Sequence, residues 1–160
     1  MKKVLLLISV LALVLVGCSD GIPEKIKDKA PNLDKITQVK PSYIVELIET
    51  KATFVFYFSS SVCGACQYMK NVNNEVVERK SFPIYYIEMD KTSDKQLNLI
   101  YKYVVKPQAT PTYVVVINGV IKESFTPEVI VGDDTGFLDE HFDLYVVNLI
   151  AVLKAKGLMN

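Results

Sequence analysis

The sequence has no excess of charge of either sign. Lysine plus arginine and aspartate plus glutamate each total 18, so the formal net charge at pH 7 is zero. No local run of basic residues departs from this balance. Because proteins that bind nucleic acid gather lysine and arginine on one face, we expect no nucleic-acid partner.

Histidine and cysteine are also scarce, with one and three copies in the chain. A structural zinc ion takes four ligands, drawn mainly from these two residue types. Cys63 and Cys66 could supply two of them, but the single histidine, His141, has no cysteine near it in the sequence. We therefore predict no metal ion and no other bound cofactor.

The chain is too short for two full domains, because its 160 residues provide one sizeable hydrophobic core. It contains no internal repeat and no low-complexity tract. We predict a single domain over residues 36–160. Residues 1–35 differ from it in composition and form two further segments.

The first segment has the composition of an export signal. Lys2 and Lys3 precede an apolar stretch, rich in leucine and valine, from Val4 to Val16. A helix needs about 20 apolar residues to cross a bilayer, so this shorter stretch fits a signal peptide that is removed after export. We predict a lipoprotein signal peptide over residues 1–17.

Leu15-Val16-Gly17-Cys18 ends the apolar stretch and resembles the bacterial lipobox. The resemblance implies that Cys18 receives a diacylglyceryl group and becomes the first residue after cleavage. Its acyl chains would hold the protein on the extracytoplasmic side of a bacterial cell membrane. Residues 18–35 are polar and interrupted by proline and glycine, as in a tether. A secreted protein with an unmodified Cys18 is the alternative.

Strand and helix patterns alternate through the predicted domain. Thr53 to Phe58 is almost entirely β-branched and aromatic, as in a central strand that is buried on both faces. From Gly64 to Arg79, apolar residues recur every three or four positions, which predicts an amphipathic helix. Asn118-Gly119 predicts a two-residue hairpin between strands over 112–117 and 120–125.

The remaining elements follow from the same patterns. We expect a strand over 84–87, helices over 42–50, from Ser93 to Tyr101 and from Phe142 to Leu153, and a long loop over Thr126–Glu140. The order of the elements predicts an α/β fold, with a central mixed sheet of about four to five strands flanked by helices.

Cys63-Gly64-Ala65-Cys66 stands where the predicted central strand gives way to the helix. A spacing of three residues brings the second sulfur one helical turn from the first, close enough for a disulfide. Unpaired N–H groups and the helix dipole stabilise a thiolate at this end of a helix and lower its pKa from about 8.5. Cys63 is therefore the predicted nucleophile, and Gly64 is expected to let the backbone turn sharply.

This motif predicts thiol–disulfide exchange. Cys63 would attack a substrate disulfide to form a mixed disulfide, and Cys66 would then attack Cys63 and release the reduced substrate. The same steps in reverse would oxidise a substrate. A purely structural disulfide in an oxidising compartment is the alternative.

The order of the motifs resembles that of the thioredoxin family. The matching segments are Tyr57-Phe58, Cys63 to Cys66, the strand from Ile84 to Asp90, Thr110-Pro111-Thr112 and Asn118-Gly119. The resemblance covers about Ile36 to Lys156 and implies a thioredoxin-like fold. It further implies that Pro111 is a cis-proline facing the cysteine pair and that the Thr110 backbone binds an extended substrate strand.

Two positions depart from thioredoxin itself. Val62 stands where a tryptophan usually precedes the first cysteine, and Tyr57 stands where a buried acid usually lies. Without that carboxylate, the proton of Cys66 would pass to water, to the Tyr57 hydroxyl or to another acid such as Glu88.

Together the motifs predict a membrane-anchored thiol–disulfide oxidoreductase that acts on protein thiols or disulfides and works with a separate redox partner. The sequence is also similar to small exported thioredoxin-like proteins of the bacteriocin-transport accessory type. We expect a monomer. The rival hypothesis is a non-catalytic module that uses the same fold to dock a transporter or a maturation partner.

Overall fold

The computed structural model describes residues 34–131 and 137–159. The predicted signal peptide, Cys18 and nearly all of the predicted tether lie outside these residues. Within the described ranges, no helix has the length and the apolar character needed to cross a membrane.

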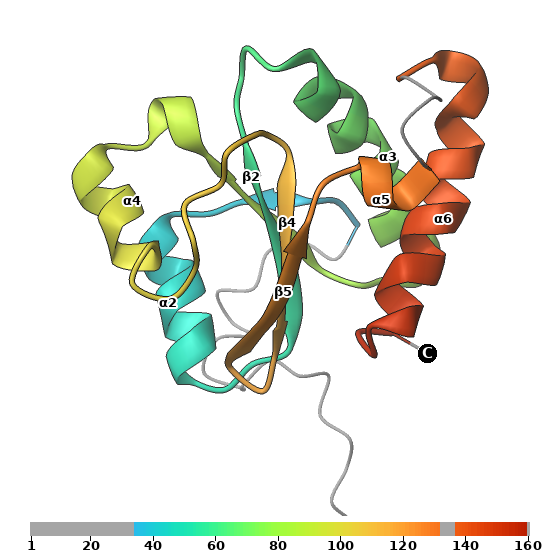
Figure 1. Ribbon diagram of the computed structural model, residues 1–160. Coiled ribbons are helices and arrows are strands. Elements are labelled where there is room, and N and C mark those ends of the chain that lie inside the picture. Colours follow the sequence, from blue (N-terminus) through green and yellow to red (C-terminus); the bar gives the residue numbers. More distant parts are fainter. Residues whose placement is uncertain (1–33, 132–136, 160) are drawn as a thin grey trace, which may run out of the picture.

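A five-stranded mixed sheet forms the centre of the domain (Figure 1). The strands are β1 (Thr37–Gln38), β2 (Phe54–Ser59), β3 (Ile84–Glu88), β4 (Thr112–Ile117) and β5 (Val120–Phe125). Their order is β1-β3-β2-β4-β5. β1 and β2 run parallel to β3, whereas β4 runs antiparallel to both β2 and β5. The predicted α/β class and mixed sheet are confirmed.

Helices cover both faces of the sheet. On one side lie α2 (Pro41–Glu49) and α4 (Asp94–Ile100), and on the other lie α3 (Gly64–Lys80) and α6 (Phe142–Ala155) (Figure 1). Two 3-10 turns, η1 (Met89–Lys91) and η2 (Asp139–His141), precede α4 and α6. Each side of the sheet has its own hydrophobic core.

The central strand β2 contributes to both cores, and all six of its residues are buried. Phe54, Phe56 and Phe58 pack in the core under α2 and α4, whereas Val55 and Tyr57 pack in the core under α3 and α6. Because both faces are covered, apolar and aromatic residues follow one another in β2 without a polar alternation. The two cores hold the end of β2, from which the chain enters the segment with the two cysteines.

Two details differ from the predictions. α2 begins at Pro41 and not after an N-cap at Ser42, because proline at the first helical position has a suitable φ and loses no hydrogen bond there. The predicted loop over Thr126–Glu140 contains a one-turn helix, α5 (Glu128–Val131), and runs into η2, while residues 132–136 lie outside the described residues. The helix forms where the apolar side chain of Ile130 is buried in the core under α3 and α6.

Asn118 and Gly119 form the predicted hairpin between β4 and β5. Both have positive φ angles, of 53° and 74°, as this kind of two-residue turn requires. The Gly119 N–H donates a hydrogen bond to the Ala52 carbonyl oxygen at 2.9 Å. A Cβ atom added to Gly119 would lie 2.3 Å from the Ile48 carbonyl oxygen. The close approach of the hairpin to α2 therefore requires glycine.

We predict that Gly119→Ala destabilises the protein more than Gly157→Ala. Both glycines have a φ of 74°, so each alanine should introduce a similar backbone strain of about 1–2 kcal/mol. A Cβ atom on Gly157 meets nothing within 4 Å, whereas one on Gly119 clashes with the backbone of α2. Urea unfolding of the two variants measures the difference. Equal losses of unfolding free energy would contradict the described contact.

Candidate functional site

Cys63 lies at the junction between β2 and α3. It is the N-cap residue of α3 and has an extended backbone, with φ −93° and ψ 114°. A disulfide joins it to Cys66, with a Cα–Cα distance of 5.2 Å. The Cys63 sulfur also accepts a hydrogen bond from the Cys66 N–H at 3.1 Å. In the reduced protein, this N–H and the positive end of the helix dipole would stabilise a Cys63 thiolate.

The two cysteines differ in exposure. Cys63 is half-buried, whereas Cys66 is 1% exposed. Val62, directly before Cys63, is 88% exposed and presents an apolar side chain beside it. A disulfide approaching from solvent can therefore reach Cys63 and not Cys66.

The Thr110–Pro111 segment faces Cys63. Its peptide bond is cis, and the Cys63 sulfur lies 3.2 Å from the Thr110 carbonyl oxygen. The oxidised sulfur has no proton to donate, but a reduced Cys63 thiol could donate one to that oxygen. The Thr112 hydroxyl donates to the Ala109 carbonyl oxygen at 2.7 Å and closes the turn around Pro111. The fold thus brings Cys63 and the segment Thr110-Pro111-Thr112 together.

Gly64 does not have the role predicted for it. Its φ is not positive, and a Cβ atom added to it meets nothing within 4 Å. The chain instead reverses one step earlier, where the Cys63 N–H donates to the Ser60 carbonyl oxygen at 3.3 Å. The sharp turn that presents Cys63 is therefore made by residues 60–63.

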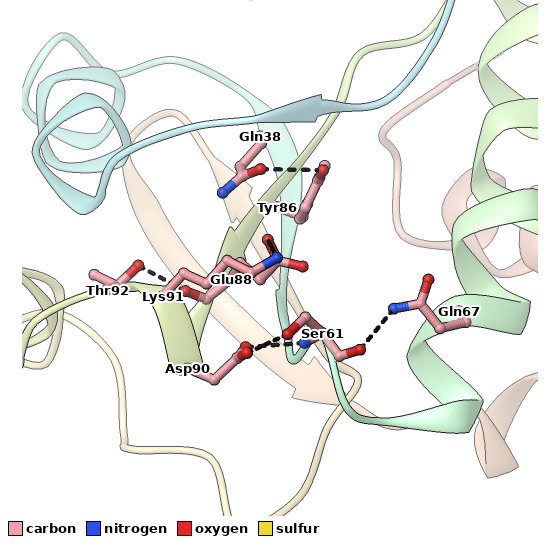
Figure 2. Close-up of polar contacts among 8 residues, drawn as sticks. All are labelled: Gln38, Ser61, Gln67, Tyr86, Glu88, Asp90, Lys91 and Thr92. Carbon is pink, nitrogen blue, oxygen red and sulfur yellow. Dashed lines mark hydrogen bonds and ion pairs between the residues drawn. The ribbon is translucent and has the colours of Figure 1, made fainter.

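Ser61, within this turn, is bonded to two other parts of the fold (Figure 2). Its N–H donates to Asp90 Oδ1 at 2.9 Å, and its hydroxyl donates to Asp90 Oδ2. Its carbonyl oxygen accepts a hydrogen bond from the Gln67 side chain of α3 at 3.2 Å. The hydroxyl and the N–H of Ser61 lower the pKa of Asp90 below its ordinary value of 3.8. The sequence analysis did not single out any of these three residues.

Further polar contacts fix the segment that carries Asp90 (Figure 2). Glu88, at the end of β3, is 8% exposed, and its carboxylate forms an ion pair with Lys91 Nζ at 3.1 Å. Its carbonyl oxygen accepts a hydrogen bond from the Thr92 hydroxyl at 2.7 Å. Side chains alternate along β3, so Glu88 lies on the sheet face of Tyr86, the face that α3 covers.

Tyr57 is not suited to take a proton from Cys66. Its ring is fully buried under α3 and α6, and this burial raises the pKa of its hydroxyl far above the ordinary value of 10.0. The hydroxyl faces Asn73 without a hydrogen bond of normal geometry. Asn73 lies about two helical turns, roughly 10 Å, beyond Cys66 along α3. Of the three acceptors predicted for the proton of Cys66, Glu88 and water remain.

The cysteine pair itself supplies the chemistry of the site, because a disulfide can accept two electrons and two protons. In residues 34–131 and 137–159, no three histidine, cysteine, aspartate or glutamate side chains gather closely enough to hold a metal ion. The two cysteines are chemically suited to exchange between thiols and disulfides.

Known structures identify the fold, although no protein-family model and no curated protein matches the sequence. The chain is similar to oxidised thioredoxin O1 from Arabidopsis thaliana, with a TM-score of 0.51 and 20% identity, over 76% of this chain and 96% of that chain. Thioredoxin O2 from the same plant gives a TM-score of 0.51 and 23% identity, over 76% and 94% of the two chains. A chain in the complex of ferredoxin:thioredoxin reductase with thioredoxin f2 gives a TM-score of 0.52 and 13% identity, over 77% of this chain and 96% of that chain.

These likenesses establish that the chain has a thioredoxin-like fold, as the order of its motifs predicted. They span nearly the whole of the thioredoxin chains. At 13–23% identity these likenesses show the fold alone. The reaction depends on the residues of the site.

We predict that Tyr113→Phe destabilises the protein and that Tyr57→Phe does not. The Tyr57 hydroxyl is buried without a hydrogen bond of normal geometry, so its removal should be neutral or stabilising by up to about 1 kcal/mol. The Tyr113 hydroxyl donates to Asn73 Oδ1 at 2.9 Å, so its removal leaves a buried acceptor unpaired and should cost about 1–3 kcal/mol. Urea unfolding tests both, and a larger loss for Tyr57→Phe would contradict the described packing.

Proposed function

We propose that the protein is a thiol–disulfide oxidoreductase that acts on protein substrates through Cys63 and Cys66. The observation that carries this proposal is the position of the Cys63 sulfur, 3.1 Å from the Cys66 N–H and 3.2 Å from the Thr110 carbonyl oxygen. Cys63 is half-buried at the start of a helix, where a thiolate is stabilised, and the Thr110 backbone lies beside it. A purely structural disulfide has no need of either feature.

In the reducing direction, the Cys63 thiolate attacks one sulfur of a substrate disulfide. A mixed disulfide forms between Cys63 and the substrate, and the other substrate sulfur leaves as a thiolate that takes up a proton. Cys66 then loses its proton and attacks Cys63, which forms the Cys63–Cys66 disulfide and releases the second substrate thiol. The substrate gains two electrons and two protons, and the protein loses the same number.

The Thr110–Pro111 segment is proposed to hold the substrate. Thr110 is half-buried next to Cys63, so an extended peptide lying across it would place its own sulfur near Cys63. Backbone hydrogen bonds would then bind substrates of different sequence. This fits an enzyme that acts on protein thiols or disulfides in general.

The proposal includes export and a membrane anchor at Cys18, because residues 1–18 have the pattern of a lipoprotein signal. The domain would then act at the extracytoplasmic side of the cell membrane. A separate redox partner must restore the cysteine pair after each cycle. A thioredoxin of similar fold forms a complex with ferredoxin:thioredoxin reductase, and a protein partner that docks on Cys63 would serve the same need here.

Cys63→Ser is expected to lower insulin reduction by dithiothreitol to the uncatalysed rate, because the attacking sulfur is lost. Cys66→Ser, reduced, freed of dithiothreitol and then mixed with insulin, should instead accumulate a mixed disulfide with the substrate, seen as a covalent adduct on a non-reducing gel, since no thiol remains to resolve it. Cys18→Ser is the matched control and should retain full activity in the purified protein. Full activity of Cys63→Ser would rule out the proposed reaction and favour the docking hypothesis.

Cys18→Ala is expected to abolish the incorporation of labelled palmitate in bacterial cells and to release the protein from the membrane fraction. Without its thiol, residue 18 cannot receive the diacylglyceryl group, and stable anchoring by acyl chains is lost. Cys63→Ala should keep both the label and the membrane association. Label retained in the Cys18→Ala variant, or absent from the unmodified protein, would refute the predicted anchor.

A further inference from the structure

Every polar group of Ser61 is bonded to a side chain outside the turn that presents Cys63 (Figure 2). Its N–H and its hydroxyl both donate to the carboxylate of Asp90, and its carbonyl oxygen accepts from Gln67. Asp90 is 29 residues away in the sequence and lies in η1, just after β3. Ser61 therefore ties the turn both to the end of β3 and to α3.

Apolar packing contributes little to the shape of this turn. Val62 is 88% exposed, and Ser60, Ser61 and Cys63 are each only half-buried. A segment with few buried apolar contacts opens easily unless other interactions hold it. The bonds of Ser61 to Asp90 and Gln67 supply such interactions.

Asp90 is itself held in place by its neighbours. The Glu88–Lys91 ion pair spans it, and the Thr92 hydroxyl is bonded to the Glu88 carbonyl oxygen. The Thr92 N–H also donates to the Met89 carbonyl oxygen at 3.2 Å. These contacts hold the backbone of η1, from which the exposed side chain of Asp90 reaches Ser61.

We propose that Asp90 is a positioning residue for the redox reaction: by binding Ser61 it keeps the Cys63 sulfur at the N-terminus of α3. This inference rests on the proposed function. Ser61 lies two positions before Cys63, whose sulfur accepts the Cys66 N–H, so a shift of the turn moves that sulfur away from its donor. The Cys63 thiolate then loses stabilisation, the pKa of the thiol rises, and less thiolate is available to attack.

The charge of Asp90 has the opposite effect on Cys63, because a nearby carboxylate disfavours a thiolate. Asp90→Ala alone therefore combines two changes of opposite sign, the loss of the bonds to Ser61 and the loss of the charge. Ser61→Ala separates them, since it removes the hydroxyl bond and leaves the carboxylate charged. The Ser61 hydroxyl can hold the turn only while residue 90 carries an acceptor, and alanine carries none, so the effects of the two substitutions should not be additive.

The test is a cycle of four full-length proteins: unmodified, Ser61→Ala, Asp90→Ala and the double variant. Each is reduced, and the rate of Cys63 alkylation by iodoacetamide is followed from pH 5 to pH 9 by mass spectrometry of the Cys63 peptide. Ser61→Ala should slow alkylation at pH 6 about threefold, because a smaller fraction of the Cys63 thiol is ionised. The same substitution should have no further effect in the Asp90→Ala protein.

Asp94→Ala is the matched control, because Asp94 is an exposed acid in the first turn of α4. Ser61→Ala should slow alkylation as much in the Asp94→Ala protein as in the unmodified one. An unchanged rate for Ser61→Ala, or an equal effect in the Asp90→Ala background, would overturn the inference. A change in unfolding free energy without a change in the pH profile would show a structural role alone and would also overturn it.

Different results would refute the inference and the proposed function. If Cys63→Ser retains insulin reduction, the proposed reaction is wrong. If Cys63→Ser is inactive but Ser61→Ala reacts like the unmodified protein, the reaction stands and only the role of Asp90 is wrong.

Discussion

The Cys63 sulfur is held between two backbone groups, the Cys66 N–H at 3.1 Å and the Thr110 carbonyl oxygen at 3.2 Å. The first group belongs to α3, which begins directly after Cys63, and the second precedes β4. Both elements are set by β2, which is buried on both faces and pairs with β4 in antiparallel register. The burial of one central strand therefore determines whether the two cysteines meet Thr110–Pro111 at all.

The core under α3 and α6 contains an aromatic residue, Tyr57, at the position where thioredoxin usually has a buried acid. Tyr57 stacks on Tyr86 at 5.5 Å and lies 5.2 Å from Tyr113 between ring centres. Burial raises the pKa values of Tyr57 and Tyr113, so neither hydroxyl accepts or loses a proton readily at neutral pH. Of the three proton acceptors predicted for Cys66, water and Glu88, the carboxylate at the end of β3, therefore remain.

Sequence patterns predicted those elements of the fold that depend on interactions between residues close together in the chain. The apolar run of β2, the helical period of α3 and the Asn118-Gly119 turn each follow from residues that are close in the sequence. The bond between Ser61 and Asp90 joins residues 29 positions apart, and no spacing rule relates a serine in a turn to an acid after another strand. The role expected of Gly64 was wrong for a related reason, since glycine is common in turns but here the turn is completed at Cys63.

A redox titration of Cys63 and Cys66 against glutathione, read by mass after alkylation, tests the central claim most directly. The account predicts one reversible two-electron transition between dithiol and disulfide, with a potential in the range of about −270 to −120 mV found for redox-active pairs in such folds. A reduction potential below about −300 mV, as structural disulfides have, would contradict a redox role of the pair.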